Sequence, residues 1–205
     1  MRQLGDVAIS AVIGQLGGDP DGKFDHMAAG LNNAIRDSVS SFRAAARTWL
    51  SADGVDSRQK IGMDYLAQGL TVCESPIERV LLPWMVFSDW NPIAAPPIPV
   101  HIPDGDKPFP RTSLVIVPQL KFANARFDFA LFVRDIGVRR IIAVECDGRD
   151  FHDVRKDMAR DAYFSGRGIQ TVRLTGSDLT KNPARCAHDV FAAVAETYNA
   201  SVIAT

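Results

Sequence analysis

The end of the third predicted strand constrains the fold and chemistry of this chain more than any other segment. Residues Ile141 to Val144 form a continuous apolar run, which is typical of a central strand buried inside a sheet. The run then ends in two acids, Glu145 and Asp147. Because side chains alternate along a strand, a spacing of two places both carboxylates on one face. The segment therefore predicts a buried strand that carries acidic groups at its end.

Helix and strand signals place this strand in a regular order of elements. Ser75-Pro76-Ile77-Glu78 predicts the start of a helix that runs to Phe87, with Ser75 as cap and Glu78 as capping-box acid. Strands are predicted over residues 113–118, 127–133, 140–146 and 169–174, and further helices over residues 153–165 and from residue 182. The order includes a strand–helix–strand crossover, which predicts a small mixed sheet of the α/β (α+β) class.

The chain of 205 residues is long enough for one domain with an extension. We predict a helical N-terminal extension over residues 1–70 and a main domain over residues 71–205. Residues 90–110 hold seven of the twelve prolines and are predicted to form an extended connector. The extension is a candidate docking arm for a protein partner or for a second copy of the chain.

Composition excludes several classes of protein. No apolar run approaches the roughly 18–20 residues that a membrane-spanning helix requires. The three cysteines, Cys73, Cys146 and Cys186, are widely spaced, which predicts reduced thiols and a cytoplasmic location. The net charge is -1, but residues 121–185 carry 13 Lys or Arg against 9 Asp or Glu, a local excess of +4. This excess fits a polyanionic partner and fits an ordinary solvated surface equally well.

Acids in neighbouring strands predict a cation site. Asp128 lies between two phenylalanines of the second strand, next to the strand that ends in Glu145 and Asp147. Carboxylates in apolar strands cost free energy unless they are paired or bind a cation. Mg²⁺ and Mn²⁺ prefer such oxygen ligands. In the alternative interpretation, Asp128 pairs with an arginine such as Arg126 or Arg173, and Asp147 begins an ordinary turn.

Together these residues resemble the PD-(D/E)XK nuclease superfamily, and within it the very-short-patch-repair-like endonuclease branch. The resemblance covers about residues 73–194. It rests on the residues Ser75-Pro76-Ile77-Glu78, Asp128, Glu145-Cys146-Asp147-Gly148, Phe151-His152, Arg155-Lys156-Asp157, Arg160-Asp161 and Val172-Arg173-Leu174. It implies a restriction-endonuclease-like core and metal-dependent hydrolysis of DNA phosphodiester bonds.

The resemblance also implies a ligand set for Mg²⁺ or Mn²⁺. Asp128 and Glu145 would bind the metal, with the carbonyl of Cys146 as a further ligand. Asp147 stands where the superfamily usually has a catalytic lysine. It would complete the metal cluster or hold a second ion. Alternatively, Lys156 or Arg160, one turn apart on the crossover helix, would supply the missing positive charge.

Other polar residues have two interpretations each. His152 is placed to transfer a proton at the mouth of the site, or is a solvated residue at a helix start. Glu78 faces the site, or only caps its helix. The basic residues near the crossover helix would contact DNA phosphates, or would form ion pairs with the interleaved acids. These residues are Arg149, Arg155, Lys156, Arg160 and Arg173.

The missing lysine motivates a second hypothesis of another class. The chain would then be a catalytically inactive nuclease fold that serves in nucleic-acid binding or protein assembly. This hypothesis predicts that the acids are scattered or held in salt bridges. A third hypothesis is a nuclease toxin or a subunit of a mobile-element machine, in which residues 1–70 dock to a partner protein.

Overall fold

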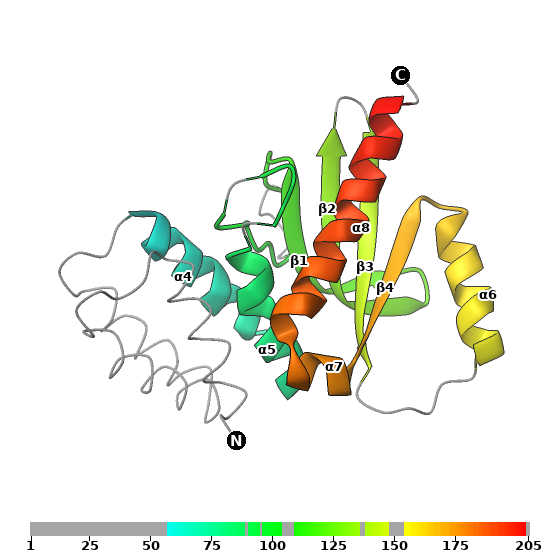
Figure 1. The fold of residues 1–205 in the computed structure, drawn as a ribbon, viewed down its shortest axis with the longest axis horizontal. Helices are drawn as coiled ribbons and strands as arrows, with labels where there is room; N and C mark the ends of the chain where they lie inside the picture. Colours follow the sequence, from blue (N-terminus) through cyan, green and yellow to red (C-terminus); the bar gives the residue numbers. More distant parts are fainter. Residues whose placement is uncertain are drawn as a thin grey trace.

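A computed structural model describes residues 57–88, 90–94, 96–103, 109–135, 138–147 and 154–203. Most of the predicted N-terminal extension, residues 1–56, therefore lies outside the described residues. The described elements, labelled in Figure 1, are α4 (Ser57–Leu70), α5 (Pro76–Val86), β1 (Leu114–Phe122), β2 (Ala125–Asp135), β3 (Val138–Asp147), α6 (Val154–Ser165), β4 (Ile169–Thr175), α7 (Gly176–Lys181) and α8 (Pro183–Ile203).

The four strands form one mixed sheet in the order β1-β2-β3-β4. β1 pairs antiparallel with β2, and β2 pairs antiparallel with β3. β4 follows the crossover helix α6 and pairs parallel with β3, because only a crossover can return the chain in the same direction. The predicted mixed α/β class is confirmed, and the predicted elements from Ser75 onward occur in the expected order, with the short helix α7 in addition.

Helices cover both faces of the sheet (Figure 1). α5 and α8 pack on one face, where Ile142 and Val144 of β3 join the larger core cluster. α6 packs on the other face through Phe164, which joins a smaller cluster with Ala143. The alternation of β3 between two covered faces confirms that it is the buried central strand that the apolar run predicts.

The last helix, α8, buries the apolar stripe that the sequence predicts. Cys186, Val190, Phe191 and Val194 are all buried against the larger core cluster. Their spacing of three or four residues places them on one side of the helix. α8 therefore closes the face of the sheet that α5 also covers.

α4 contributes to the same core as the sheet. Its residues Met63, Leu66 and Leu70 are buried in the larger cluster together with residues of α5. The division of the chain at residue 70 stays a prediction, but the described end of the extension packs directly onto the main domain. Within the described residues, no helix is long and apolar enough to span a membrane.

Two elements differ from the expectation. β1 was predicted to end at Pro118, but it continues to Phe122. Proline cannot donate a backbone hydrogen bond, yet it is tolerated here because β1 is the outermost of the four named strands. The short helix α7 was not predicted. It begins at a Thr175 cap, whose side chain accepts from the N–H of Asp178. This local signal lies close before Pro183, where the next helix begins.

The start of α5 matches the prediction in its details. Ser75 Oγ accepts a hydrogen bond from the N–H of Glu78 at 3.3 Å, and Glu78 Oε1 accepts from the N–H of Ser75 at 3.1 Å. Both halves of the capping box are therefore present.

Replacing Ser75 by alanine is expected to lower the free energy of unfolding by about 1 kcal/mol, because the N–H of Glu78 loses its acceptor. Urea denaturation followed by circular dichroism measures the difference. The matched control, Ser75→Thr, keeps the hydroxyl and should retain most of the stability. Equal loss in both variants would show that the hydroxyl is not what holds this helix end.

Candidate functional site

Polar residues occupy one level of the sheet in all four strands. Glu145 of β3 pairs with Arg173 of β4 in the parallel register. Continuing the β2–β3 register by one residue places Asp128 opposite Glu145. The β1–β2 register likewise places Gln119 opposite Asp128. We call Gln119, Asp128, Glu145 and Arg173 the polar row.

The polar row lies where β2 and β3 stop pairing. The last backbone pair between these strands is Phe129 with Val144. Beyond it, Asp128 Oδ2 accepts a hydrogen bond of 2.7 Å from the backbone N–H of Cys146. The carboxylate thus takes the place of a backbone acceptor and is fixed beside the residue that follows Glu145. This hydrogen bond holds Asp128 of β2 close to the acid-bearing end of β3, as the sequence predicts.

The backbone departs from regular alternation at this level. Phe129 packs in the larger core cluster, but Phe127, two residues earlier, packs in the cluster on the α6 face. On the neighbouring strand, Gln119 has a φ of 52°, a value that L residues other than Gly, Asn and Asp seldom adopt. Irregular strand residues re-aim side chains, and they are frequent beside functional sites. The irregular backbone therefore distinguishes the level of Asp128 within the sheet, and this observation does not depend on the charge of Asp128.

Glu145 is buried and is held by guanidinium groups. Its Oε2 accepts a hydrogen bond of 2.8 Å from Nη2 of Arg160 on α6, and Nη1 of Arg173 lies 3.7 Å away. Nη2 of Arg173 also donates to Asp161 Oδ1 at 2.8 Å. The residue is 8% exposed, and its carboxylate requires such partners because an isolated buried charge is costly. The predicted residues Arg160 and Arg173 are thus both brought to Glu145.

The alternative interpretation of the sequence pairs Asp128 with Arg126, but Arg126 has a different partner. Its guanidinium forms a bidentate ion pair with the exposed Glu74, at 2.7 and 2.8 Å. Arg173 pairs with Asp161 and Glu145. Arg160 of the crossover helix pairs with Glu145 of β3, and i,i+4 pairing among the basic residues of this helix stays a prediction.

The structure confirms that Glu78 caps its helix, and the role of Glu78 in a functional site stays a prediction. Besides its capping bonds, Glu78 Oε2 accepts a hydrogen bond of 2.8 Å from Gln119 Nε2. The side chain is buried, so this contact connects the start of α5 directly to the polar row. Sequence reasoning missed Gln119, since a lone glutamine in an apolar strand carries no motif.

The pKa of the buried Cys73 thiol is affected by the charges of nearby residues, including Glu78. Burial raises the pKa of its thiol well above the usual range. The negative charge of Glu78 raises the pKa further, Arg79 lowers it, and Asp128 raises it. Glu78 and Asp128 therefore both disfavour the charged form of this buried thiol.

We expect Cys73 and Cys186 of the folded protein to resist alkylation at about pH 8, because buried, protonated thiols are poor nucleophiles. Burial, with the charges of Asp178 and Asp189, raises the pKa of Cys186 to about 11. Iodoacetamide labelling with peptide mapping measures the rates with and without denaturant. Rapid labelling of either thiol in the native protein would show that the core around it opens.

Several predicted site residues are not placed. Asp147 is the last residue of β3 and pairs with Thr175, but its side chain is outside the described part of the structure. The same holds for the side chains of Arg155 and Lys156 on α6. Arg149 and His152 lie outside the described residues altogether. Their roles stay predictions.

The donor chemistry of the polar row fits a hard divalent cation. Asp128 and Glu145 supply carboxylate oxygens from neighbouring strands, and Cys146, whose N–H donates to Asp128, has a backbone carbonyl. Among the side chains that the structure describes, no three His, Cys, Asp or Glu residues are close enough to hold a metal together. Asp147, which the sequence predicts as the third carboxylate, is not in that set.

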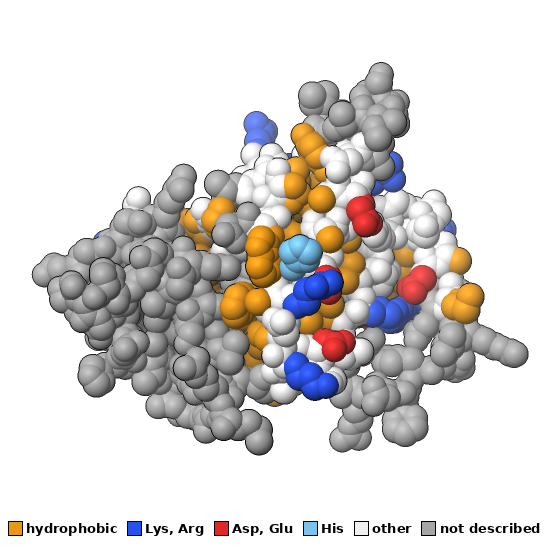
Figure 2. All heavy atoms as spheres, viewed as in Figure 1, with side chains coloured by type: hydrophobic (Ala, Val, Ile, Leu, Met, Phe, Trp, Pro, Cys, Tyr) orange, Lys and Arg blue, Asp and Glu red, His pale blue; other side chains and the backbone are white. Residues whose placement is uncertain are grey.

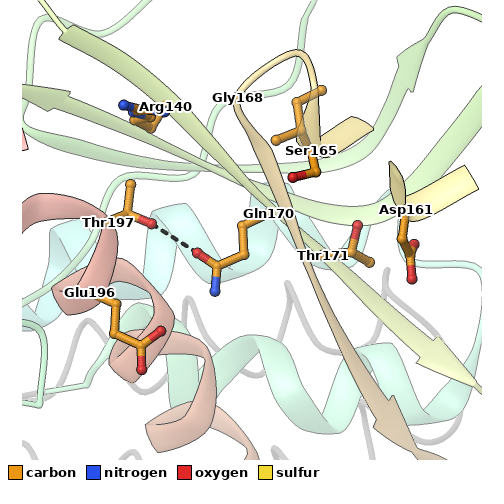
Figure 3. Close-up of a pocket in the computed structure, with 9 residues that line it drawn as sticks. Arg140, Asp161, Ser165, Gly168, Gln170, Thr171, Glu196 and Thr197 are labelled. Atoms are coloured by element: carbon orange, nitrogen blue, oxygen red, sulfur yellow. Dashed lines mark hydrogen bonds between the residues drawn. The ribbon is translucent and has the colours of Figure 1, made fainter. Parts of the chain in front are cut away.

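A pocket of about 510 Å³ lies beside the polar row. It is lined by residues of α6, β4 and α8, together with Arg140 of β3 and Gly168 between α6 and β4. Figure 3 shows Glu196 and Thr197 on one side of β4 and Asp161 on the other. Asp161 also pairs with Arg173, so this one residue joins the pocket to the polar row. The acids Asp128 and Glu145 do not line it.

No family model, curated protein or solved structure matches the chain. The function is therefore inferred from the residues of the polar row and from the fold that positions them.

Proposed function

We propose that the protein is a metal-dependent endonuclease that hydrolyses DNA phosphodiester bonds and has a restriction-endonuclease-like core. The observation that carries this proposal is the bond between Asp128 Oδ2 and the N–H of Cys146. It fixes an acid of β2 beside the acid-bearing end of β3, at the level where the two strands stop pairing. Acids brought together from neighbouring strands are the arrangement that a site for Mg²⁺ or Mn²⁺ requires.

The arrangement of the elements supports the proposal. The resemblance to the PD-(D/E)XK superfamily implies one helix, three strands, a crossover helix and a fourth strand. The described chain has α5, then β1 to β3, then α6 and β4, with β4 parallel to β3. Of the residues that carry the resemblance, Asp128, Glu145 and Arg173 belong to the polar row, and Arg160 contacts Glu145.

Each group of the proposed site has a distinct task. Asp128 and Glu145, with Asp147 and the carbonyl of Cys146, would hold the metal. The metal would neutralise charge on the scissile phosphate and lower the pKa of bound water. His152 would accept or donate the proton that is transferred during hydrolysis.

Residues around these ligands would orient them or the DNA. Glu78 would act through its hydrogen bond to Gln119, which lies opposite Asp128. Arg149, Arg155, Lys156 and Arg160 would contact phosphates from the side of α6. On the face shown in Figure 2, charged side chains of both signs are interspersed. Arg185 and Asp189 of α8 form an exposed ion pair.

The alternative function, a catalytically inactive module, is favoured by one specific observation. The ion pairs of Glu145 with Arg160 and Arg173 are the salt bridges that this hypothesis predicts. If the pairs were permanent, Glu145 would serve the stability of the fold alone, and the chain would bind nucleic acid or a protein partner without cleaving it.

Plasmid cleavage separates the two functions. The full chain is incubated with supercoiled plasmid, single-stranded DNA and RNA, with Mg²⁺, Mn²⁺ or a chelator. The proposal predicts nicking or cutting of DNA that either metal supports and the chelator stops. Salt-sensitive DNA binding with no cleavage of any substrate would favour the inactive module.

A further inference from the structure

We propose that the open edge of β4 binds an extended segment of a partner protein, which joins the sheet as an additional strand. The segment carries an acidic and a basic side chain two positions apart. It lies in the pocket that α6 and α8 form around β4, which we call the β4 groove. The proposal goes beyond the proposed nuclease function and does not depend on it, because neither Asp128 nor Glu145 lines this groove.

The two edges of the sheet differ in how they are protected. At the β1 edge, the N–H of Ile116 donates to the carbonyl of Pro99, and the N–H of His101 donates to the carbonyl of Ile116, both at 2.9 Å. β1 also contains Pro118 and Lys121, residue types that oppose pairing with a further strand. β4 contains neither type, and four of its seven residues are β-branched. Within the described residues, no strand pairs with β4 on its outer side.

The β4 groove reaches both sides of this edge strand. Gln170 faces α8, where its Oε1 accepts a hydrogen bond of 3.0 Å from Thr197 Oγ1. Arg173 faces α6, where it donates to Asp161. Both Thr197 and Asp161 line the groove, and Figure 3 shows them on opposite sides of β4. An added strand pairs with the outward backbone groups of such an edge and directs alternate side chains to its two sides.

Two exposed charges of opposite sign define which segment fits. Nη1 of Arg140 lies 3.7 Å from the position that a Cβ of Gly168 would take, so the guanidinium lies beside the start of β4. Glu196 precedes Thr197 on α8 and lines the same groove. Neither Arg140 nor Glu196 forms an ion pair within the part of the chain that the structure describes.

Both charges lie on the α8 side of the sheet, since Arg140 is two positions before Ile142, which packs in the core on that side. Residues two positions apart in an extended segment point to the same side. An acidic residue of the segment therefore pairs with Arg140 and a basic residue with Glu196.

The size of the groove favours a single segment over a second copy of the chain. Its volume of about 510 Å³ falls in the range of roughly 300–1,000 Å³ that is typical of sites for small ligands. A second copy that paired through its own β4 would bring its own α6 and α8 against the helices that line the groove.

The test selects peptides from a phage-displayed library of random short peptides on the immobilised full chain. We expect the enriched peptides to have an acidic and a basic residue two positions apart and no proline between them. Fluorescence anisotropy then gives the dissociation constant of an enriched peptide. Glu196→Gln and Arg140→Gln should each weaken binding about threefold, as for exposed ion pairs. Asp189→Asn and Arg185→Gln change an exposed ion pair of α8 outside the groove and should leave binding unchanged.

A modified peptide tests the backbone pairing. Methylation of the peptide nitrogens at alternate positions removes donors that an added strand needs, and in one of the two alternating patterns it should weaken binding at least about tenfold. Circular dichroism confirms that each variant is folded. No enrichment of peptides, binding that neither methylation pattern weakens, or equal affinity of the wild type, Glu196→Gln and Arg140→Gln would overturn the proposal. Dimerisation of the free chain in sedimentation velocity that an enriched peptide abolishes would assign the edge to a second copy and would also overturn it.

Discussion

Replacing Glu145 by glutamine is expected to lower the rate of metal-dependent DNA nicking roughly 1000-fold, a loss of about 4 kcal/mol in the stabilisation of the transition state. Glutamine preserves the size of the side chain and one acceptor for Arg160, but it removes the negative charge that would bind the metal. The measurement is the initial rate of nicking of supercoiled plasmid in Mg²⁺ at equal concentrations of folded protein.

The control for this variant is Glu74→Gln. Glu74 is exposed and pairs with Arg126 at the surface, so its substitution removes the same charge outside the polar row. The rate for Glu74→Gln should remain near that of the wild type, since surface ion pairs contribute little. Equal rates for the two variants would show that Glu145 has no part in catalysis.

Replacing Phe129 by alanine is expected to lower the free energy of unfolding by about 3–5 kcal/mol. The ring is fully buried in the larger core cluster, next to the level of Asp128. Its loss leaves a cavity between β2 and the helices on that face, and the surrounding residues cannot close it completely. Urea denaturation, followed by circular dichroism and by tryptophan fluorescence, gives the difference.

Phe129→Leu is the matched control, because it keeps an apolar side chain and much of the volume. It should cost clearly less than Phe129→Ala. A loss below about 1 kcal/mol for the alanine variant would contradict the placement of this ring, since surface substitutions have effects of that size.

The sequence was sufficient for the order of the elements because the signals involved are local. The apolar run before Glu145 predicted the buried strand, and Ser75 with Glu78 predicted the capped start of α5. The alternation rule also predicted that Cys146 points into the core, away from Glu145, and Cys146 does join the larger cluster. Each of these features depends on residues within a few positions of one another.

The connections within the site could not be predicted in this way. Gln119 meets Glu78 across 41 positions of sequence, and Asp161 meets Arg173 only because α6 packs beside β4. The sequence also does not show that Phe127 and Phe129 pack on opposite faces of the sheet, because their spacing around Asp128 is typical of one regular strand face. Such contacts depend on the register of the strands and on helix packing, which single residues do not encode.

The most direct test of the central claim compares the wild type with Asp128→Asn in one plasmid-nicking experiment with Mg²⁺ and with chelator. Asparagine can still accept the hydrogen bond from the N–H of Cys146, so the strand ends stay joined while the charge is lost. The wild type should nick DNA in Mg²⁺ only, and Asp128→Asn should be slower by at least about 100-fold. Nicking at the same rate by both proteins, or nicking that persists in chelator, would contradict the assignment of the polar row as a metal-dependent nuclease site.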